Sequence, residues 1–229
     1  PNRAMDGFGG IDVLSGIEQA TGSRFADTLV GSSAGNRLDG GAGNDTLLGG
    51  DGNDTLIGGA GFDSLDGGND TDRADYSAAP GAVTVNLADG SASNDGFGTT
   101  DTLSGIEQVT GSAFNDTITG DALANRLDGG AGNDLLDGGE SPPGVLRETD
   151  TVNYSVEGGA DAVTVNLATG VATDTFGDSD TLLNIERVIG TDFADALTGG
   201  DVTNRNTNAE NFEGRAGDDV ITGGGIAAG

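Results

Sequence analysis

Apolar residues recur every nine positions over the first third of the chain. Five leucines, Leu29, Leu38, Leu47, Leu56 and Leu65, are nine residues apart, and an Asp or Asn lies two residues before each of them. This spacing is neither the 3.6-residue period of an amphipathic helix nor the alternation of a single half-buried strand. It defines a nine-residue repeat, called a row below, with glycine at its first place, the acid at its sixth and the apolar residue at its eighth.

Six rows follow one another without a gap from residue 22 to residue 75, and the three rows of 40–66 have the most regular sequence, GGAGNDTLL, GGDGNDTLI and GGAGFDSLD. Further rows occur at 111–137, 190–198 and 214–222. A strict register of this kind, with Leu at the eighth place, argues against a disordered Gly/Asp linker. The repetition indicates a stacked repeat architecture.

A longer repeat overlies the rows. The segment 7–31 recurs at 96–120, and a looser third copy lies at 176–199. We therefore expect three units, 1–77, 78–153 and 154–229, the first containing the six-row block and the third a degenerate one. The chain begins at Pro1 without a recognisable signal peptide, as expected of a fragment of a longer protein.

Segments between these copies also predict strands. AVTVNLADG (82–90) and AVTVNLATG (162–170) alternate in polarity, as a half-buried strand does, and we expect them to continue the sheet. Tyr76 and Tyr154 precede these segments and are expected to pack at the edge of a block. Arg37 and Arg126 are expected to face outward and pair with acids.

Turn and strand together fill one row. Glycines at the first, second and fourth places permit left-handed backbone and close approach, whereas the last three places suit a short strand. Two rows return the chain to its starting side, so rows two apart stack at about 4.8 Å. The eighth-place residues then form a thin core, and the turns form two columns of acids along the edges.

Charge makes this stack depend on a cation. The chain has 38 Asp and Glu against 9 Arg and Lys, a net charge of −29. Such a chain repels itself, and stacked carboxylates repel one another strongly. Carboxylates and glycine carbonyls are hard oxygen ligands of the kind Ca²⁺ prefers, whereas Zn²⁺ is disfavoured because the chain has no His and no Cys. The sequence therefore predicts calcium in the turns.

The same composition disfavours other functions. A nucleic-acid-binding stripe of basic residues is absent, anionic membranes would repel the chain, and its apolar runs are too short to span a bilayer. Nucleophiles activated by His, or Cys–His systems, cannot be built from this chain. We expect no enzymatic activity, although a carboxylate pair of the glycosidase kind remains open among so many acids.

The rows at 40–66 resemble the calcium-binding nonapeptide G-G-x-G-x-D-x-U-x of RTX proteins, the haemolysin-type family. The segment 101–134 is also similar to the rolls of serralysin-type secreted proteases and of alginate epimerase R-modules. The resemblance implies an all-β fold, an elongated right-handed parallel β-roll or β-solenoid with calcium ions in its turns. It also implies export through a type I secretion channel and folding outside the cell.

The resemblance implies a ligand scheme as well. One row supplies its sixth-place side chain and the carbonyls of its second and fourth residues, and the row two further on supplies its sixth-place side chain and the carbonyls of its first and third. The sixth-place ligands would be Asp27, Asn36, Asp45, Asp54, Asp63, Asp72, Asp116, Asn125, Asp134, Asp195 and Asp219. The carbonyl ligands would be Ser23, Phe25, Ser32, Ala34, Gly40, Gly41, Ala42, Gly43, Gly49, Gly50, Asp51, Gly52, Gly58, Ala60, Gly67, Asn69, Ser112, Phe114, Gly129, Ala131, Thr191, Phe193, Gly214 and Ala216.

Departures from the repeat refine this scheme. Phe25, Phe114 and Phe193 replace the fourth-place glycine and are expected to begin a roll and cover its open end. Glu18, Glu107 and Glu186 lie in a sixth-place frame without the glycines, and we do not expect them to be ligands. The third unit completes a site only if the insertion before Asn211 loops out.

These features predict an extracellular calcium-binding module that folds when Ca²⁺ binds, with roughly four to eight ions held at the weak affinities of extracellular sites. The parent is expected to be a repetitive adhesin on the bacterial surface. The alternatives are the C-terminal folding and secretion domain of an exported hydrolase or epimerase, and a calcium-dependent carbohydrate-binding module. A partner besides calcium would be an extracellular polysaccharide or a cell-surface molecule, with no nucleic acid and no membrane insertion.

Overall fold

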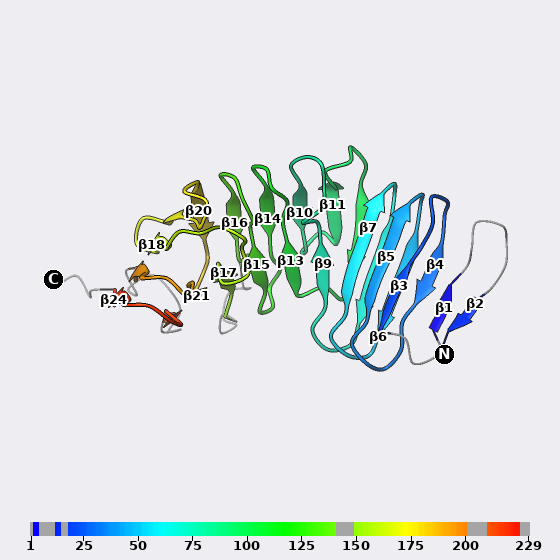
Figure 1. The fold of residues 1–229 in the computed structure, drawn as a ribbon, viewed down its shortest axis with the longest axis horizontal. Coiled ribbons are helices and arrows are strands. Elements are labelled where there is room, and N and C mark those ends of the chain that lie inside the picture. The colour runs from blue at the N-terminus through cyan, green and yellow to red at the C-terminus, as the bar shows by residue number, and fades with distance from the viewer. Residues whose placement is uncertain (1, 5–11, 15–17, 141–148, 201–209, 225–229) are drawn as a thin grey trace. The chain divides into compact units, whose positions relative to one another are not determined.

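The computed structural model describes residues 2–4, 12–14, 18–140, 149–200 and 210–224, which form strands, turns and bends (Figure 1). The chain divides into two compact units, Pro1–Ser112 and Ala113–Gly229. The expected division into three units by sequence repeat stays a prediction. The predicted insertion of the third unit includes residues 201–209, which lie outside the described residues.

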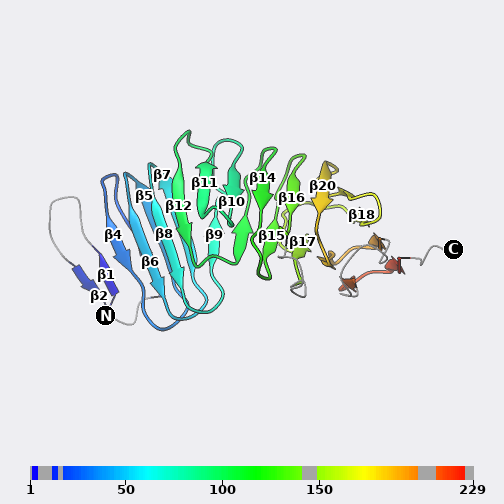
Figure 2. The ribbon, with the colours of Figure 1, turned by 180° about the vertical axis from the view of Figure 1, so that it is seen from behind.

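The described residues of unit 1 form thirteen strands: β1 (Asn2–Ala4), β2 (Asp12–Leu14), β3 (Gln19–Thr21), β4 (Thr28–Val30), β5 (Arg37–Ala42), β6 (Thr46–Gly50), β7 (Thr55–Ala60), β8 (Ser64–Gly68), β9 (Arg73–Asp75), β10 (Thr84–Asn86), β11 (Ser91–Asn94), β12 (Asp101–Ser104) and β13 (Gln108–Thr110). One sheet has the order β2-β1-β4-β6-β8-β12-β11-β10, and the other has β13-β9-β7-β5-β3. Successive rows thus alternate between two sheets, as the nine-residue period predicts. Figure 2 shows the first of these sheets from the opposite side.

Unit 2 repeats the arrangement with eleven strands in the part of it that the structure describes: β14 (Thr117–Thr119), β15 (Arg126–Asp128), β16 (Leu135–Asp137), β17 (Thr151–Asn153), β18 (Thr164–Asn166), β19 (Val171–Thr173), β20 (Ser179–Leu183), β21 (Arg187–Ile189), β22 (Ala196–Thr198), β23 (Asn211–Glu213) and β24 (Val220–Thr222). Its sheets have the orders β14-β16-β20-β19-β18-β22-β24 and β23-β21-β17-β15. The all-β parallel β-roll predicted from the rows is confirmed.

The strands of each sheet pair in a register that places the eighth-place residues opposite one another. Leu29 pairs with Leu47 and Leu47 with Leu65 across β4, β6 and β8, while Leu38 pairs with Leu56 in the opposite sheet. All five side chains are buried. One apolar side chain per row therefore fills the narrow space between the two sheets, and a slip of one residue would move every leucine to the outer face.

An antiparallel hairpin interrupts each unit. β10 pairs with β11 and β18 with β19, and the chain then resumes the parallel stack, with β12 on β8 and β20 on β16. The alternating segments 82–90 and 162–170 contain β10 and β18, so the prediction that they continue a sheet is confirmed. Tyr76 and Tyr154, which precede the hairpins, are buried.

The two outward-facing arginines pair as expected. Arg37 lies 3.8 Å from Asp39, and Arg126 lies 3.2 Å from Asp128. Each pair joins residues two apart on one strand, where side chains share a face. The partly exposed Arg37–Asp39 pair contributes little to stability, on the order of 0–1 kcal/mol.

The burial of the eighth-place leucines predicts how truncating one of them changes the stability of the protein. Leu47→Ala should destabilise the calcium-loaded protein by about 3 kcal/mol, since the fully buried side chain would leave a cavity between two stacked leucines. Urea unfolding in excess Ca²⁺ measures this. Leu123→Ala is the control, because Leu123 is 59% exposed. Equal effects of the two changes would contradict the assignment of the eighth place to the core.

Candidate metal sites in the turns

Sixth-place residues form a continuous hydrogen-bonded ladder along one edge of unit 1. The backbone amide of Asp27 donates to Asp45 Oδ1 (2.7 Å), that of Asp45 to Asp63 Oδ1 (2.8 Å), and that of Asp63 to Asp101 Oδ1 (3.1 Å). Each carboxylate therefore bonds the backbone of the equivalent residue two rows earlier. These bonds set the stacking of the turns, as the strand pairs set that of the sheets.

A second ladder runs along the other edge of unit 1. The amide of Asn36 donates to Asp54 Oδ1 (2.6 Å) and that of Asp54 to Asp72 Oδ1 (2.7 Å). The amide of Asp72 donates to Glu107 Oε2 (2.9 Å), so Glu107 takes the next sixth place. The irregular row at 67–75 thus keeps its position in the stack, although it lacks the fourth-place glycine and has the small, fully buried Ala74 at its eighth place.

Unit 2 contains the same ladders with longer interruptions. Asp116 and Asp134 are linked at 2.8 Å, and Asp134 and Asp180 at 3.1 Å. On the other edge, the amide of Asn125 donates to Asp150 (2.9 Å) and that of Asp150 to Glu186 (3.2 Å). The sequence rows that contain Asp116, Asn125 and Asp134 are therefore stacked as predicted.

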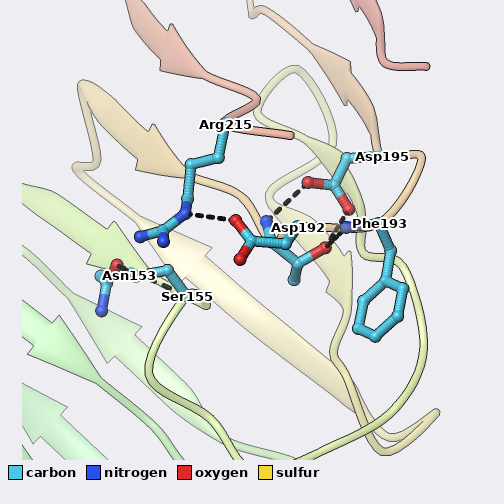
Figure 3. Close-up of polar contacts among 7 residues, drawn as sticks. Asn153, Ser155, Asp192, Phe193, Asp195 and Arg215 are labelled. Carbon is cyan, nitrogen blue, oxygen red and sulfur yellow. Dashed lines mark hydrogen bonds and ion pairs between the residues drawn. The ribbon is translucent and has the colours of Figure 1, made fainter. Parts of the chain in front are cut away.

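Asp195 and Asp219 are brought together across the insertion that separates them. The amide of Asp195 donates to Asp219 Oδ1 (3.0 Å), and β22 pairs with β24. Within its own row, Asp195 accepts bonds from the amide and hydroxyl of Thr191, whose Oγ1 accepts the amide of Phe193 (Figure 3). The loop of this row is therefore closed by hydrogen bonds that its own side chains make.

Sequence reasoning missed five members of the ladders as site residues: Asp101, Glu107, Asp150, Asp180 and Glu186. Asp101 and Asp180 are the sixth residues of rows 96–104 and 175–183, which also carry Leu at the eighth place. The sequence therefore contained the pattern that identifies both residues. The pattern was missed because a hairpin, rather than one further row, separates Asp101 and Asp180 from their neighbours in the stack.

The first-place glycines create an oxygen-lined space. A Cβ atom added to Gly40 would lie 2.7 Å from the carbonyl oxygen of Gly58 and against Asp45 Oδ2, and Gly49 meets the equivalent Gly67 oxygen and Asp54 Oδ2. Neither Gly40 nor Gly49 has a positive φ. Glycine is therefore needed at the first place for room, because the carboxylate of its own row and a carbonyl of the row two further on converge there.

Second- and fourth-place glycines are needed for backbone conformation. Gly41 and Gly43 have φ of 93° and 127°, in the left-handed region. A Cβ on Gly43 would also lie 2.7 Å from the carbonyl oxygen of Phe25 in the row above. Carbonyls predicted as ligands thus line the narrow space between stacked turns, as the family scheme requires, and their role as ligands stays a prediction.

Several sixth-place carboxylates are buried with one oxygen that has no hydrogen-bond partner. Among the described residues, the buried oxygens without a hydrogen-bond partner include Oδ2 of Asp45, Asp54, Asp63, Asp72 and Asp134. Burial raises the pKa of Asp63 and of Asp72 to about 6 and that of Asp134 to about 8, and neighbouring carboxylates add to each shift. A nearby cation reverses this effect, because it favours the charged form.

Together these oxygens fit Ca²⁺. Among the described residues, no group of three or more Asp or Glu side chains is arranged to hold a metal ion. A site in these turns must therefore combine two carboxylates with backbone carbonyls, which is an all-oxygen donor set of the kind calcium takes. The orphaned Oδ2 atoms and the space beside the first-place glycines supply such a set.

The three fourth-place phenylalanines do not cover the roll as expected. The side chains of Phe25, Phe114 and Phe193 are more than 40% exposed. Figure 3 shows the Phe193 ring directed away from the polar contacts of its loop. The fourth place lies in the turn, outside the space between the sheets, so an aromatic residue there faces solvent.

Comparison with known proteins identifies the repeat. The family model of the RTX calcium-binding nonapeptide repeat matches four segments, residues 21–56, 48–78, 110–141 and 206–225. These segments contain every sixth-place Asp and Asn predicted from the sequence except Asp195. A search of curated proteins finds no match. The described residues contain no helix long and apolar enough to cross a membrane.

The ladder predicts unequal losses of calcium. Asp45 lies between Asp27 and Asp63, so Asp45→Ala should disturb two stacked sites, whereas Asp27→Ala should disturb one. Calcium counted by native mass spectrometry should fall further for Asp45→Ala. Asp51→Ala is the control, because its exposed side chain lies outside the ladder and its carbonyl remains. Equal losses at Asp45 and Asp27 would refute the stacking of sites.

Proposed function

The chain is an RTX repeat protein whose nonapeptide rows stack into parallel β-rolls, and from this we propose that it is an extracellular module that folds when calcium binds. RTX repeats bind calcium and occur in secreted bacterial proteins. The observation that carries the proposal is the set of buried sixth-place carboxylates, each with an unpartnered Oδ2, at Asp45, Asp54, Asp63, Asp72 and Asp134.

The chain's own residues determine how folding would depend on the ion. Sixth-place carboxylates such as Asp45 order the turns through Oδ1, and they direct Oδ2 to the space beside the first-place glycine. Burying many like charges opposes folding, and the net charge of −29 opposes compaction. Calcium, when bound, supplies the positive charge that offsets both costs, so that metal affinity becomes folding free energy.

Folding that depends on calcium is compatible with export of the chain in an unfolded state. A highly charged chain stays expanded where free calcium is scarce and folds where calcium is abundant, which is the order of events that type I secretion and folding outside the cell require. The repeated long unit supports a repetitive adhesin as the parent protein. A C-terminal folding domain of an exported hydrolase or epimerase is the alternative, and this module would in either case have no catalytic activity of its own.

A calcium titration tests the proposal. Circular dichroism of the chain in excess chelator should show an expanded state, and β-structure should appear as Ca²⁺ is added, with a midpoint of about 10⁻⁴–10⁻³ M. Mg²⁺ is the control and should not replace calcium, because it keeps its waters and fits crowded carbonyl sites poorly. If the β-signal is complete in chelator and calcium leaves it unchanged, folding is not coupled to the ion.

Exposed phenylalanines favour a second candidate function, a contact surface for neutral glycans. In unit 1, Phe25, Phe62 and Phe97 all lie in turns that precede strands of the sheet β4-β6-β8-β12, and they are 42% to 59% exposed. Phe114, Phe176 and Phe193 have the same relation to β14, β20 and β22 in unit 2. Solvent-facing aromatic side chains gathered on one edge indicate a binding surface, and the acidic chain disfavours anionic partners.

Binding to neutral glycans should therefore require both the folded roll and the phenylalanines. A glycan array probed in Ca²⁺ should give signals that disappear in chelator and in the triple variant Phe25→Ser, Phe62→Ser, Phe97→Ser, since flat apolar faces stack on sugar rings. The control replaces Leu123 and Val156, which are exposed elsewhere, with Ser. A triple variant that binds as the unchanged protein does would eliminate this surface as the contact.

A further inference from the structure

The turn of row 22–30 is closed by two hydrogen bonds within the row itself. Asp27 Oδ2, at the sixth place, accepts the backbone amide of Ser23 at the second place (2.5 Å). Ser23 Oγ in turn accepts the amide of Phe25 at the fourth place (3.2 Å). The second-place side chain and the sixth-place side chain therefore satisfy two amides of the turn without help from another row.

The same two bonds recur in three further rows. The sixth-place side chain accepts the amide of the second-place residue at 2.6 Å in each, and the second-place side chain accepts the amide of the fourth-place residue at 2.8 to 3.2 Å. The residues at the second, fourth and sixth places are Ser32, Ala34 and Asn36; Asp121, Leu123 and Asn125; and Thr191, Phe193 and Asp195. We call the turns of these four rows self-closed.

Five other rows have a different turn, and in each of them the second residue is glycine. These rows contain every sixth-place carboxylate whose Oδ2 is buried without a hydrogen-bond partner among the described residues, namely Asp45, Asp54, Asp63, Asp72 and Asp134. Their second-place residues are Gly41, Gly50, Gly59, Gly68 and Gly130. We call these turns open, because the oxygen that a self-closed turn uses internally remains available.

The backbone of the two kinds of turn also differs at the second place. In open turns the second-place glycine has a φ in the left-handed region, as at Gly41 (93°) and Gly50 (114°), whereas Ser23 and Thr191 do not have a positive φ. A Cβ atom on Gly41 would also meet the carbonyl oxygen of Ser23 in the row above. The residue at the second place therefore sets both the conformation of the turn and its hydrogen bonds.

The bonds of a self-closed turn need no neighbouring row. They join residues two and four apart in sequence, so only a short loop has to close. In open turns the fourth-place amide bonds to the next row of the stack instead. The amide of Gly43 donates to the carbonyl oxygen of Ala60 (2.8 Å), and that of Gly52 donates to Asp70 Oδ2 (3.0 Å). An open turn therefore depends on its neighbour for its hydrogen bonds.

Charge separates the two kinds of turn further. In two of the self-closed turns the sixth-place residue is neutral, Asn36 or Asn125, so no carboxylate charge is buried there. Each open turn buries a carboxylate that has one oxygen without a hydrogen-bond partner. Burying such a charge opposes folding, and a bound cation offsets this cost.

Self-closed turns come early in the blocks of rows. Rows 22–30 and 31–39 are the first two of the six-row block, and row 190–198 is the first of the third block. Row 120–128 directly precedes the open row 129–137 in the second block. Along the chain, self-closed turns are therefore followed by open ones.

We propose that the second-place residue determines whether a turn is ordered by its own side chains or by calcium, so that a block begins with turns that form without the ion and continues with turns that require it. The self-closed turns give the first open turns an ordered partner, because the amide of Asp27 bonds Asp45 and that of Asn36 bonds Asp54. This inference rests on the proposed function, since the open turns are the ones whose calcium binding would drive folding.

Hydrogen exchange in chelator tests the self-closed turns directly. NMR measurements on the full chain without calcium should show that the amides of Phe25 and Ala34 exchange more slowly, relative to their intrinsic rates, than those of Gly43 and Gly52. The first two amides are bonded within their own rows, whereas the other two need the stack. Equal protection at the four positions would overturn the inference.

Removing the hydroxyls supplies the matched variant. Ser23→Ala with Ser32→Ala leaves charge and backbone carbonyls unchanged, and it should abolish the extra protection in chelator. In Ca²⁺ it should lower the folding equilibrium constant, measured by urea unfolding, by about fivefold, with the number of bound ions in native mass spectrometry unchanged. Ser23→Thr with Ser32→Thr keeps the hydroxyls and should behave as the unchanged chain does. Ser33→Ala is the control, because Ser33 is an exposed serine of the same turn that takes no part in these bonds.

The possible failures can be told apart. If the unchanged protein has its full β-structure in chelator, the proposed function is wrong. If folding requires calcium but the double alanine variant exchanges and unfolds as the unchanged protein does, the second place does not determine how a turn is ordered. A loss of bound ions in that variant would make the hydroxyls calcium ligands and would likewise overturn the inference.

Discussion

The bond between a sixth-place carboxylate and the backbone amide two rows earlier is the contact on which the rest of the structure depends. It joins Asp27 to Asp45 and Asp45 to Asp63, and it recurs through both units. This bond fixes the vertical alignment of the turns and so the pairing of the strands that follow them. It also buries a column of negative charge, which a thin core of one apolar side chain per row cannot offset alone.

Stability and function are therefore linked through one set of atoms. At Asp45, Asp54, Asp63, Asp72 and Asp134, Oδ1 holds the turn, whereas Oδ2 remains without a hydrogen-bond partner in a space lined by carbonyl oxygens. The hydrogen bonds of Oδ1 fix the alignment of the turns. The buried, unpartnered Oδ2 atoms lower the stability of the folded roll when no cation is bound. Ions bound along such a column, one between each pair of stacked turns, would contribute at every level of the stack, which gives folding a steep dependence on calcium.

The inserted hairpins add residues to the stack that the regular rows do not supply. The hairpins β10–β11 and β18–β19 leave the ladder intact, because Asp101 and Asp180 resume it. They also add buried acids, Asp95 and Asp174, that no row would supply.

The sequence by itself determined the repeat, the alternation of rows between two sheets, the buried leucines and the acids of the regular rows, because each depends only on spacing within a row or between rows two apart. Asp195 and Asp219 could be paired from sequence on the condition that the insertion loops out. The tertiary structure alone decided that Glu107 and Glu186, which the sequence placed in a sixth-place frame, are members of the ladder, and that Phe25 faces solvent. Those outcomes depend on where a chain of irregular length returns to the stack, and no local pattern encodes that return.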